Sequence, residues 1–182
     1  VPLGTFLSGG LDSSIISAVA AEEYRNRGQQ LDTFSVTYTD NMKYFRTSRF
    51  QPSTDEPYIR QMVRFLGSNH HTFVVDNEQL AYALKTAVDA RDLPGMADID
   101  SSLLLFCEEI KKYVTVALSG ECADEIFGGY PWYRDEKIRS AYGFPWAQTT
   151  AMRQKFLAPR FRDLIDGEAE VSSRYEKTLA ET

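Results

Sequence analysis

A short loop rich in serine and glycine, Ser8-Gly9-Gly10, constrains the fold of this chain more than any other stretch. It follows an apolar, strand-like segment, residues 3–7, and precedes a run of helical character, residues 13–27. Backbone N–H groups at a helix N-terminus have no partner within the helix, and the helix dipole favours negative charge there. A strand, a tight loop and a helix start therefore predict an anion site. Gly9 and Gly10 would let the backbone approach a phosphate closely.

The side chains of this loop favour a phosphate bound together with a metal ion. Ser8, Ser13 and Ser14 supply hydroxyl donors, whereas the Asp12 carboxylate would repel a phosphate. A divalent cation between the two removes the repulsion, because hard cations bind carboxylate and phosphate oxygens together. The loop is not of the Walker type, because no lysine follows the glycines and the spacing differs. The alternative is a plain strand-to-helix turn capped by serines.

The composition is ordinary for a soluble globular domain. The chain has 182 residues, of which 43% are hydrophobic and 25% charged, with a net charge of −6. Because there is no basic block, the sequence argues against a nucleic acid held by phosphate contacts. No apolar run approaches the roughly 18 residues of a membrane span, and no signal peptide is visible, so we expect a cytoplasmic protein without a membrane partner. The chain opens with Val1 inside a predicted strand, which indicates a fragment.

The two cysteines, Cys107 and Cys122, predict neither a metal site nor a disulfide scaffold. They do not have a paired metal spacing, and two cysteines are too few for a disulfide framework. A reducing cytoplasm fits this pattern. We expect Cys107 to be a small buried residue inside a helix rather than a nucleophile.

Strands alternate with helices along the chain, which predicts an α/β fold with a doubly wound parallel sheet. Strands are expected at residues 3–7, 31–39, 70–75 and 114–118, and helices at 13–27, 56–66, 77–91 and 101–112. In the common strand order 3-2-1-4 the first and fourth strands are neighbours, and ligands bind where the order reverses. We expect residues 1–130 to form a nucleotide-binding core and residues 131–182 to be a helical extension of the same domain, with helices at 149–157 and 168–180.

Helical spacing predicts the side chains that pack on the sheet. The expected inward faces are Ile15, Ile16, Val19, Ala20 and Tyr24 in the first helix, Ile59, Met62, Val63 and Leu66 in the second, and Leu80, Leu84, Ala87 and Val88 in the third. A capping box at Ser53-x-x-Glu56 is expected before the second helix. Asp100 or Ser101 is expected to cap the fourth helix.

Three further stretches keep two interpretations open. The loop at residues 40–52 is rich in Tyr, Phe and Arg, and it is either a cover over a site or a surface insertion. His70 and His71 point to opposite faces of a strand, which favours local hydrogen bonds over a shared metal ion. The three carboxylates of residues 92–100 either cap helices or face a substrate.

A second unusual loop, Ser119-Gly120-Glu121 and the residues after it, follows the fourth predicted strand. Residues 118–130 hold three carboxylates and three glycines. The strand order places this loop at the same crevice as the first one. Asp12 and Asp124 could then share a Mg²⁺, and Glu121 could orient or deprotonate a nucleophile. An acidic loop that caps a helix is the alternative.

This pairing of loops predicts adenylation, in which a carboxylate attacks the α-phosphate of ATP and pyrophosphate leaves. The first loop would hold the pyrophosphate. The end of the second strand, near Val36, would offer backbone groups to the base.

The two motifs together resemble a known family. Residues 8–14 (S-G-G-L-D-S-S) followed by residues 118–130 (L-S-G-E-C-A-D-E-I-F-G-G-Y) are similar to the synthetase domain of glutamine-hydrolysing asparagine synthetases. The resemblance implies a sheet of the adenine-nucleotide alpha-hydrolase-like, pyrophosphate-loop type. It implies that aspartate and ATP give β-aspartyl-AMP, that ammonia converts it to asparagine, and that AMP and pyrophosphate are released. The ammonia would come from glutamine in an N-terminal glutaminase domain that this chain lacks, so we expect the fragment alone to be inactive.

The resemblance also implies roles for single residues. The residues expected to touch the nucleotide are Leu7, Val36, Ser119 and Gly120, and those expected to hold pyrophosphate and Mg²⁺ are Ser8, Gly9, Gly10, Asp12, Ser13 and Ser14. Glu121 and Asp124 would be catalytic, with Asp124 and Asp12 as the metal ligands.

Some features depart from the family pattern. Cys122 stands where the family usually has glycine, and a side chain is tolerable there unless φ is positive. The basic residue that the family brings to the reacting phosphate has no recognisable match, and the loop near Ala97 and Asp98 differs from the commonest version. A related ligase for another carboxylate, such as a β-lactam-forming synthetase, and a non-catalytic nucleotide-binding module are therefore alternatives. The oligomeric state is not determined by the sequence, and a homodimer stays open.

Overall fold

The computed structural model describes residues 1–48, 51–162 and 164–181. Arg49 and Phe50 of the predicted loop at 40–52 lie outside the described residues. The chain divides into two compact units, Val1–Glu121 and Cys122–Thr182, and each is described by itself. The sequence predicted a nucleotide-binding core at residues 1–130 and a helical extension at residues 131–182. This functional division stays a prediction.

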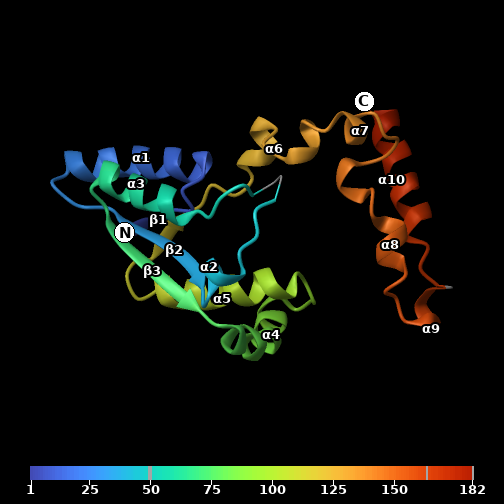
Figure 1. Ribbon diagram of the computed structural model, residues 1–182, viewed down its shortest axis with the longest axis horizontal. Coiled ribbons are helices and arrows are strands. Elements are labelled where there is room, and N and C mark those ends of the chain that lie inside the picture. Colours follow the sequence, from blue (N-terminus) through green and yellow to red (C-terminus); the bar gives the residue numbers. More distant parts are fainter. Residues whose placement is uncertain (49–50, 163, 182) are drawn as a thin grey trace. The chain divides into compact units, whose positions relative to one another are not determined.

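The first unit is built on a parallel sheet of four strands (Figure 1). The strands are β1 (Leu3–Phe6), β2 (Asp32–Tyr38), β3 (Asn69–Val75) and β4 (Val116–Leu118). Their order is β3-β2-β1-β4, and all three neighbouring pairs are parallel. The doubly wound α/β fold and the strand order expected from the sequence are confirmed.

Helices cover both faces of this sheet (Figure 1). The helices of the first unit are α1 (Leu11–Asn26), α2 (Asn41–Tyr44), α3 (Glu56–Leu66), α4 (Asn77–Arg91) and α5 (Ala97–Ile110). On the face of α1 and α3 the buried cluster is Leu7, Ala21, Leu31 and Leu66. On the face of α5 it is Phe34, Phe106, Ile110 and Val114.

Helix α1 packs on the sheet mainly through small side chains, which corrects the expected face at Ile15 and Val19, whereas Ala20 and Tyr24 pack against the buried cluster as expected. Ile15 and Val19 are 53% and 67% exposed, whereas Ser13, Ser17 and Ala21 are buried. The Ser17 hydroxyl lies 2.7 Å from the Thr5 hydroxyl, a contact that only a close approach of helix and strand allows. Small residues permit this approach, and Ile15 and Val19 therefore point away from the sheet.

Helix α3 has the predicted bounds and the predicted inward face, with Leu66 buried and Ile59, Met62 and Val63 packed beside it. Gly67 ends the helix at φ +63. The expected capping box is wrong, because the N-cap residue is Asp55 and no side chain caps it.

Helices α4 and α5 are confirmed as elements, with corrections in detail. The buried residues of α4 are Ala83 and Ala87, while Leu84 and Val88 are 39% and 36% exposed. Helix α5 begins four residues earlier than expected, after Met96, so Asp100 and Ser101 do not cap it.

Cys107 on α5 is exposed, so the prediction that it is buried is wrong. Desolvation nevertheless raises the pKa of its thiol, which keeps the sulfur protonated at neutral pH. This agrees with the expectation that Cys107 is not a nucleophile.

The second unit consists of short helices and one long helix. They are α6 (Ala123–Phe127), 3₁₀ turns at Pro131–Tyr133 and Pro145–Ala147, α7 (Glu136–Arg139), α8 (Thr150–Gln154), α9 (Pro159–Arg162) and α10 (Gly167–Glu181). The two helices expected in this region are present, although α8 is shorter than predicted. Aromatic contacts hold α10, because the Tyr175 ring meets Tyr142 and Phe144 at centroid distances of 5.0 and 5.1 Å.

No helix among residues 1–48, 51–162 and 164–181 has both the length and the apolar character needed to cross a membrane.

Candidate functional site

The loop between β1 and α1 requires glycine at position 9 for two reasons. Gly9 has φ +78, a conformation that side chains disfavour. A β-carbon there would also lie 2.8 Å from both the Ile59 nitrogen and the Tyr58 β-carbon. The first turn of α3 therefore closes directly on this loop.

Serines hold the loop in shape from inside. The Ser8 and Ser13 hydroxyls are 2.9 Å apart, and the Ser13 hydroxyl donates to the Gly10 carbonyl at 3.2 Å. Helix α1 begins directly after Gly10, which is its N-cap residue. Gly10 has an extended backbone and no side chain to cap the helix. The N–H groups of the first turn of α1 are therefore directed to the loop, as an anion site requires.

The loop after β4 lies against the start of α1. A β-carbon on Gly120 would be 3.0 Å from the Ser13 nitrogen and 3.1 Å from the Asp12 β-carbon. The pairing of Leu3 with Val116 and Thr5 with Leu118 brings the two strand ends together. Residues 119–121 of the second loop therefore lie against the first loop within the first unit, as the strand order predicted.

Leu7 and Val36 lie beside the same sheet edge. Leu7 is fully buried, and its N–H donates to the Phe34 carbonyl at 2.8 Å. The pairing of β1 with β2 ends at Phe6 and Phe34, whereas β2 continues to Tyr38. Among the described residues, the peptide groups of Val36 therefore lie past the last residue of β1, on the side of β2 that pairs with β1. Val36 packs its side chain on the α5 face.

Cys122 adopts the conformation that the sequence identified as unfavourable for a side chain. Its φ is +71 and its ψ is 2, at the residue immediately before α6. The Cys122 side chain is exposed, so no neighbouring residue crowds it.

The acidic residues after Cys122 are ordered by their own segment. The Asp124 carbonyl accepts a hydrogen bond from the Gly129 N–H at 3.1 Å, and the Asp124 carboxylate lies where a β-carbon on Gly129 would be. Tyr130 donates to the Glu125 carboxylate at 2.5 Å, which raises the pKa of Tyr130 to about 12. Asp124 belongs to the second unit, so its pairing with Asp12 stays a prediction.

The residues present suit a hard cation bound together with phosphate. Among the described residues, no group of three or more His, Cys, Asp or Glu side chains is arranged to hold a metal ion. Mg²⁺ commonly binds through one or two carboxylates plus substrate phosphates rather than in an all-protein cage. Asp12, on the first turn of α1 among serine hydroxyls, offers such an oxygen donor set.

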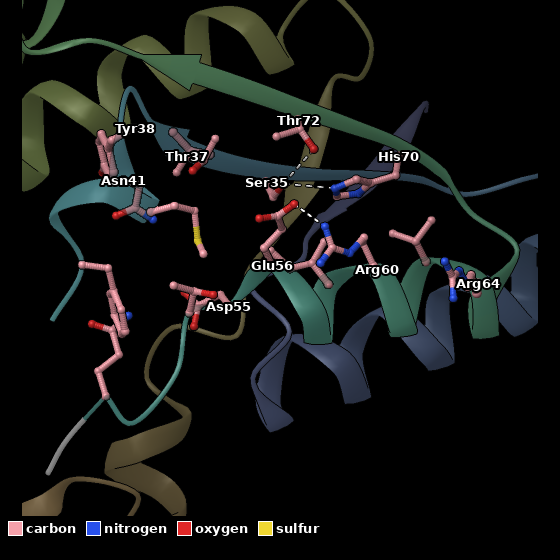
Figure 2. Close-up of a pocket in the computed structure, with 17 residues that line it drawn as sticks. Ser35, Thr37, Tyr38, Asn41, Asp55, Glu56, Arg60, Arg64, His70 and Thr72 are labelled. Carbon is pink, nitrogen blue, oxygen red and sulfur yellow. Dashed lines mark hydrogen bonds and ion pairs between the residues drawn. The ribbon is translucent and has the colours of Figure 1, made fainter. Parts of the chain in front are cut away.

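A cavity of about 600 Å³ opens on the α3 face of β2 and β3 (Figure 2). Its lining includes Val36 together with Met42 and Phe45 from the segment at residues 40–52. Both interpretations of that segment, a cover over a site and a surface insertion, stay predictions. Sequence reasoning did not single out Met42, although apolar residues just after the carboxyl end of a central strand were the available signal.

Both histidines are satisfied by neighbouring strand residues, as expected. His70 lies between the hydroxyls of Thr33 and Ser35, at 2.9 Å from Nδ1 and 3.0 Å from Nε2 (Figure 2 shows the Ser35 contact). Burial, and next the charge of His71, lower the pKa of His70. His71 faces the other side of the sheet and contacts the Asp32 carboxylate at 2.8 Å.

One acidic residue of the segment at 92–100 has a structural role. The Asp100 carboxylate accepts a hydrogen bond from Arg91 at 2.6 Å and connects α4 with α5. The side chain of Asp98 lies outside the described part of the chain. A substrate-facing role for this segment stays a prediction.

Comparison with known proteins places the whole chain in one group. Residues 1–182 match the family model described as asparagine synthase. Asparagine synthetase (glutamine-hydrolyzing) 3 of Bacillus subtilis is 50% identical over 183 residues, which cover 100% of this chain and 30% of that protein.

More distant relatives match as well. Asparagine synthetase (glutamine-hydrolyzing) 1 of Bacillus subtilis is 39% identical over 135 residues, or 74% of this chain and 19% of that protein. Amidase chyE of Penicillium rubens is 32% identical over 188 residues, or 98% of this chain and 27% of that protein. The chain thus spans less than a third of the length of each of these relatives.

Proposed function

Because the chain belongs to the asparagine synthase family, we propose that it forms the ATP-binding core of a synthetase that makes asparagine from aspartate and ammonia. The observation that carries this proposal is the contact between the two loops, in which Gly120 lies against Asp12 and Ser13. Two loops rich in glycine, serine and carboxylates at the switch point of a parallel sheet suit a nucleotide and a reacting carboxylate.

The proposed nucleotide lies along this edge of the sheet. Its pyrophosphate is held by the first loop and the start of α1, that is by Ser8, Gly9, Gly10, Asp12, Ser13 and Ser14. Its base lies beside Leu7 and the peptide groups of Val36, and Ser119 and Gly120 contact it from the β4 side. The open edge of β2 beyond Phe6 supports the position of the base.

In this proposal Mg²⁺ would be held by Asp12 and Asp124 and would draw charge from the departing phosphates. The helix N-terminus of α1 and the serine hydroxyls stabilise the same charge. Glu121 orients the incoming nucleophile or accepts its proton, and its own N–H donates to the Ser119 hydroxyl at 3.1 Å. The aspartate side chain attacks the α-phosphate, pyrophosphate leaves, and ammonia then displaces AMP from β-aspartyl-AMP.

The source of ammonia belongs to the same proposal. The two Bacillus subtilis relatives are named glutamine-hydrolyzing and are much longer than this chain. We propose that an N-terminal glutaminase domain supplies ammonia and that this chain alone does not turn over. A cytoplasmic location and a homodimer stay predictions.

Product analysis tests this function directly. The full-length protein should convert aspartate, ammonia and ATP with Mg²⁺ into asparagine, AMP and pyrophosphate in equal amounts. Turnover with another carboxylate but not with aspartate would instead support a different adenylating ligase.

A matched pair of variants separates catalysis from a non-catalytic module. Asp12→Ala should lower the rate by more than about a hundredfold, as expected for a metal-linked group. Asp89→Ala, on the exposed surface of α4, should leave the rate unchanged. Full biological activity of Asp12→Ala would favour a nucleotide-binding module without catalysis.

A further inference from the structure

A chain of hydrogen bonds runs from buried hydroxyls between β2 and β3 to the wall of the cavity on the α3 face of these strands. The Thr33 hydroxyl lies 2.9 Å from both the Ser68 hydroxyl and Nδ1 of His70. Nε2 of His70 lies 3.0 Å from the Ser35 hydroxyl, which in turn lies 3.3 Å from the Thr72 hydroxyl (Figure 2). His70 therefore links a buried pair of hydroxyls to a pair from residues that line the cavity.

The inner end of this chain is closed. Thr33 is fully buried and Ser68 is 9% exposed, and each hydroxyl has its partner within the chain. Burial, and next the charge of His71, lower the pKa of His70, which favours the neutral ring. A neutral imidazole has one donor and one acceptor, and both ring nitrogens of His70 are already engaged. His70 therefore has no hydrogen-bonding capacity left for a ligand of its own.

The outer end of the chain is open at Ser35. Its contact with Thr72, at 3.3 Å, is longer than the distance of about 2.7–2.8 Å that is usual between two hydroxyls. A hydroxyl has one donor and two acceptor sites, so Ser35 can bind a further strong partner besides His70. Ser35 is only 6% exposed, and it lines the cavity. The group that this chain offers to a ligand is therefore the Ser35 hydroxyl.

Ser35 directly precedes Val36, whose peptide groups the proposed function gives to the nucleotide base. The pairing of β1 with β2 ends at Phe34, so Ser35 and Val36 both lie past the last residue of β1. Both residues line the same cavity, and its volume of about 600 Å³ is within the range of small-molecule sites, about 300–1,000 Å³. A base that meets the peptide groups of Val36 from the α3 face is therefore beside the Ser35 hydroxyl.

We propose that the Ser35 hydroxyl contacts the base of the nucleotide and that His70 is the positioning residue for this contact. The hydrogen bond from His70 holds the Ser35 oxygen in one rotamer before the nucleotide binds. Binding then does not have to order this side chain, which lowers its entropic cost. The inference rests on the proposed function, because it requires a base beside Val36.

The neutral ring of His70 suits either direction of the hydrogen bond to the base. With the proton on Nε2, His70 donates to Ser35, and Ser35 donates its own proton to an acceptor of the base. With the proton on Nδ1, His70 accepts from Ser35, and the Ser35 oxygen accepts from a donor of the base. Ser35 thus adapts to the edge that the base presents at Val36.

Calorimetric titration of the full-length protein with AMP tests the proposal. Ser35→Ala removes the hydroxyl and should weaken AMP binding about threefold to tenfold. His70→Asn keeps an amide near the position of Nδ1, which reaches Thr33 but not Ser35, and should weaken binding by a similar factor. His70→Gln carries its amide one bond further, to the position of Nε2, and should keep the affinity within about twofold of the unaltered protein. The double variant of Ser35→Ala and His70→Asn should lose no more affinity than Ser35→Ala alone, because both changes act through one hydroxyl.

His71→Asn is the matched control in the same strand. The His71 side chain faces the other side of the sheet and contacts Asp32, so its replacement should lower the urea midpoint without changing the AMP affinity. Turnover separates binding from chemistry, because the KM for ATP should rise in Ser35→Ala and His70→Asn while kcat stays within about twofold. Urea unfolding of each variant verifies that the titrated protein is folded.

Unchanged AMP affinity in folded Ser35→Ala would overturn the proposal and keep the proposed function. A loss in His70→Asn that adds to the loss in Ser35→Ala, or an equal loss in His71→Asn, would show that His70 acts through the stability of the sheet and would overturn its positioning role. Absence of AMP binding in the unaltered protein would refute the proposed function and the contact with Ser35 together.

Discussion

The two loops of the candidate site solve the same backbone problem with different residues. The first loop has Gly9 at φ +78, and the second has Cys122 at φ +71 in addition to Gly128 at φ +66. Glycine adopts this conformation without penalty, whereas a residue with a β-carbon loses about 1–2 kcal/mol. A β-carbon at Gly9 would collide with α3, but Cys122 is exposed. The comparison shows that a side chain is tolerated at a left-handed position only where surrounding space allows it.

The largest effect is expected from Gly9→Ala. The substitution adds about 1–2 kcal/mol of conformational strain and about 1–3 kcal/mol of overpacking against Tyr58 and Ile59. The free energy of unfolding should therefore fall by roughly 2–5 kcal/mol, and ATP binding should be lost. Urea unfolding and calorimetry measure the two effects.

Gly28→Ala is the matched control for this prediction. Gly28 also has positive φ, +68, but a β-carbon there meets nothing within 4 Å. Its cost should be the conformational strain alone, about 1–2 kcal/mol, with ATP binding intact. Equal losses in the two variants would show that contact with α3 contributes nothing at Gly9.

Gly120→Ala should have the next largest effect, because it separates the two loops. Its β-carbon would lie 3.0 Å from the Ser13 nitrogen, so the loop or the start of α1 has to move by a few tenths of an ångström. We expect about 1–2 kcal/mol less stability and about tenfold weaker ATP binding, measured as for Gly9→Ala. Unchanged ATP affinity would mean that the contact of the two loops does not shape the nucleotide site.

Cys122→Gly should act in the opposite direction. Relief of the left-handed strain gains about 1–2 kcal/mol, and the greater freedom of glycine in the unfolded chain returns about 0.5–1 kcal/mol. The net gain is between about 0 and 1.5 kcal/mol, which a rise in the urea midpoint would show. Cys122→Ala keeps the β-carbon and serves as the control, with no gain expected. A gain in Cys122→Ala equal to that in Cys122→Gly would locate the effect in the sulfur rather than the backbone.

Local pattern was enough to predict the sheet and the meeting of the loops. β-Branched and aromatic runs marked β2 and β3, and Gly67 marked the end of α3. The strand order followed from the alternation of strands and helices, and it brought Gly120 to Ser13 without any knowledge of their contact.

The features that the sequence did not predict depend on tertiary packing. The spacing of apolar residues favoured Ile15 and Val19 as the inner face of α1, but the Ser17–Thr5 hydrogen bond and small residues set a closer approach. The cavity beside α3 forms from residues 35–72 of four different elements, and no local pattern encodes such an enclosure. The left-handed φ of Cys122 likewise follows from the chain path into α6 rather than from its own preference.

The smallest expected effect is the pH dependence of the free energy of unfolding that His70 causes. It sets the pH range in which the variants of the two loops are best compared. Burial and the neighbouring His71 lower the pKa of His70 below 6.5, its ordinary value. Below about pH 6.5 the unfolded chain therefore binds more protons at this position than the folded protein does. Stability from His70 is complete above pH 6.5 and decreases as the pH falls toward the folded pKa.

Urea midpoints of the unaltered protein and His70→Gln between pH 8 and pH 5 measure this contribution. Both proteins keep the other groups around this position, His71 with Asp32 on one face and Glu56 with Arg60 across the cavity, so their effects cancel in the difference. The unaltered protein should lose stability more steeply than His70→Gln below pH 6.5, and the two curves should be parallel above it. Parallel curves over the whole range would mean that His70 is protonated equally in both states. The small differences expected for Gly120→Ala and Cys122→Gly are therefore best measured above pH 7, where the charge of His70 does not change.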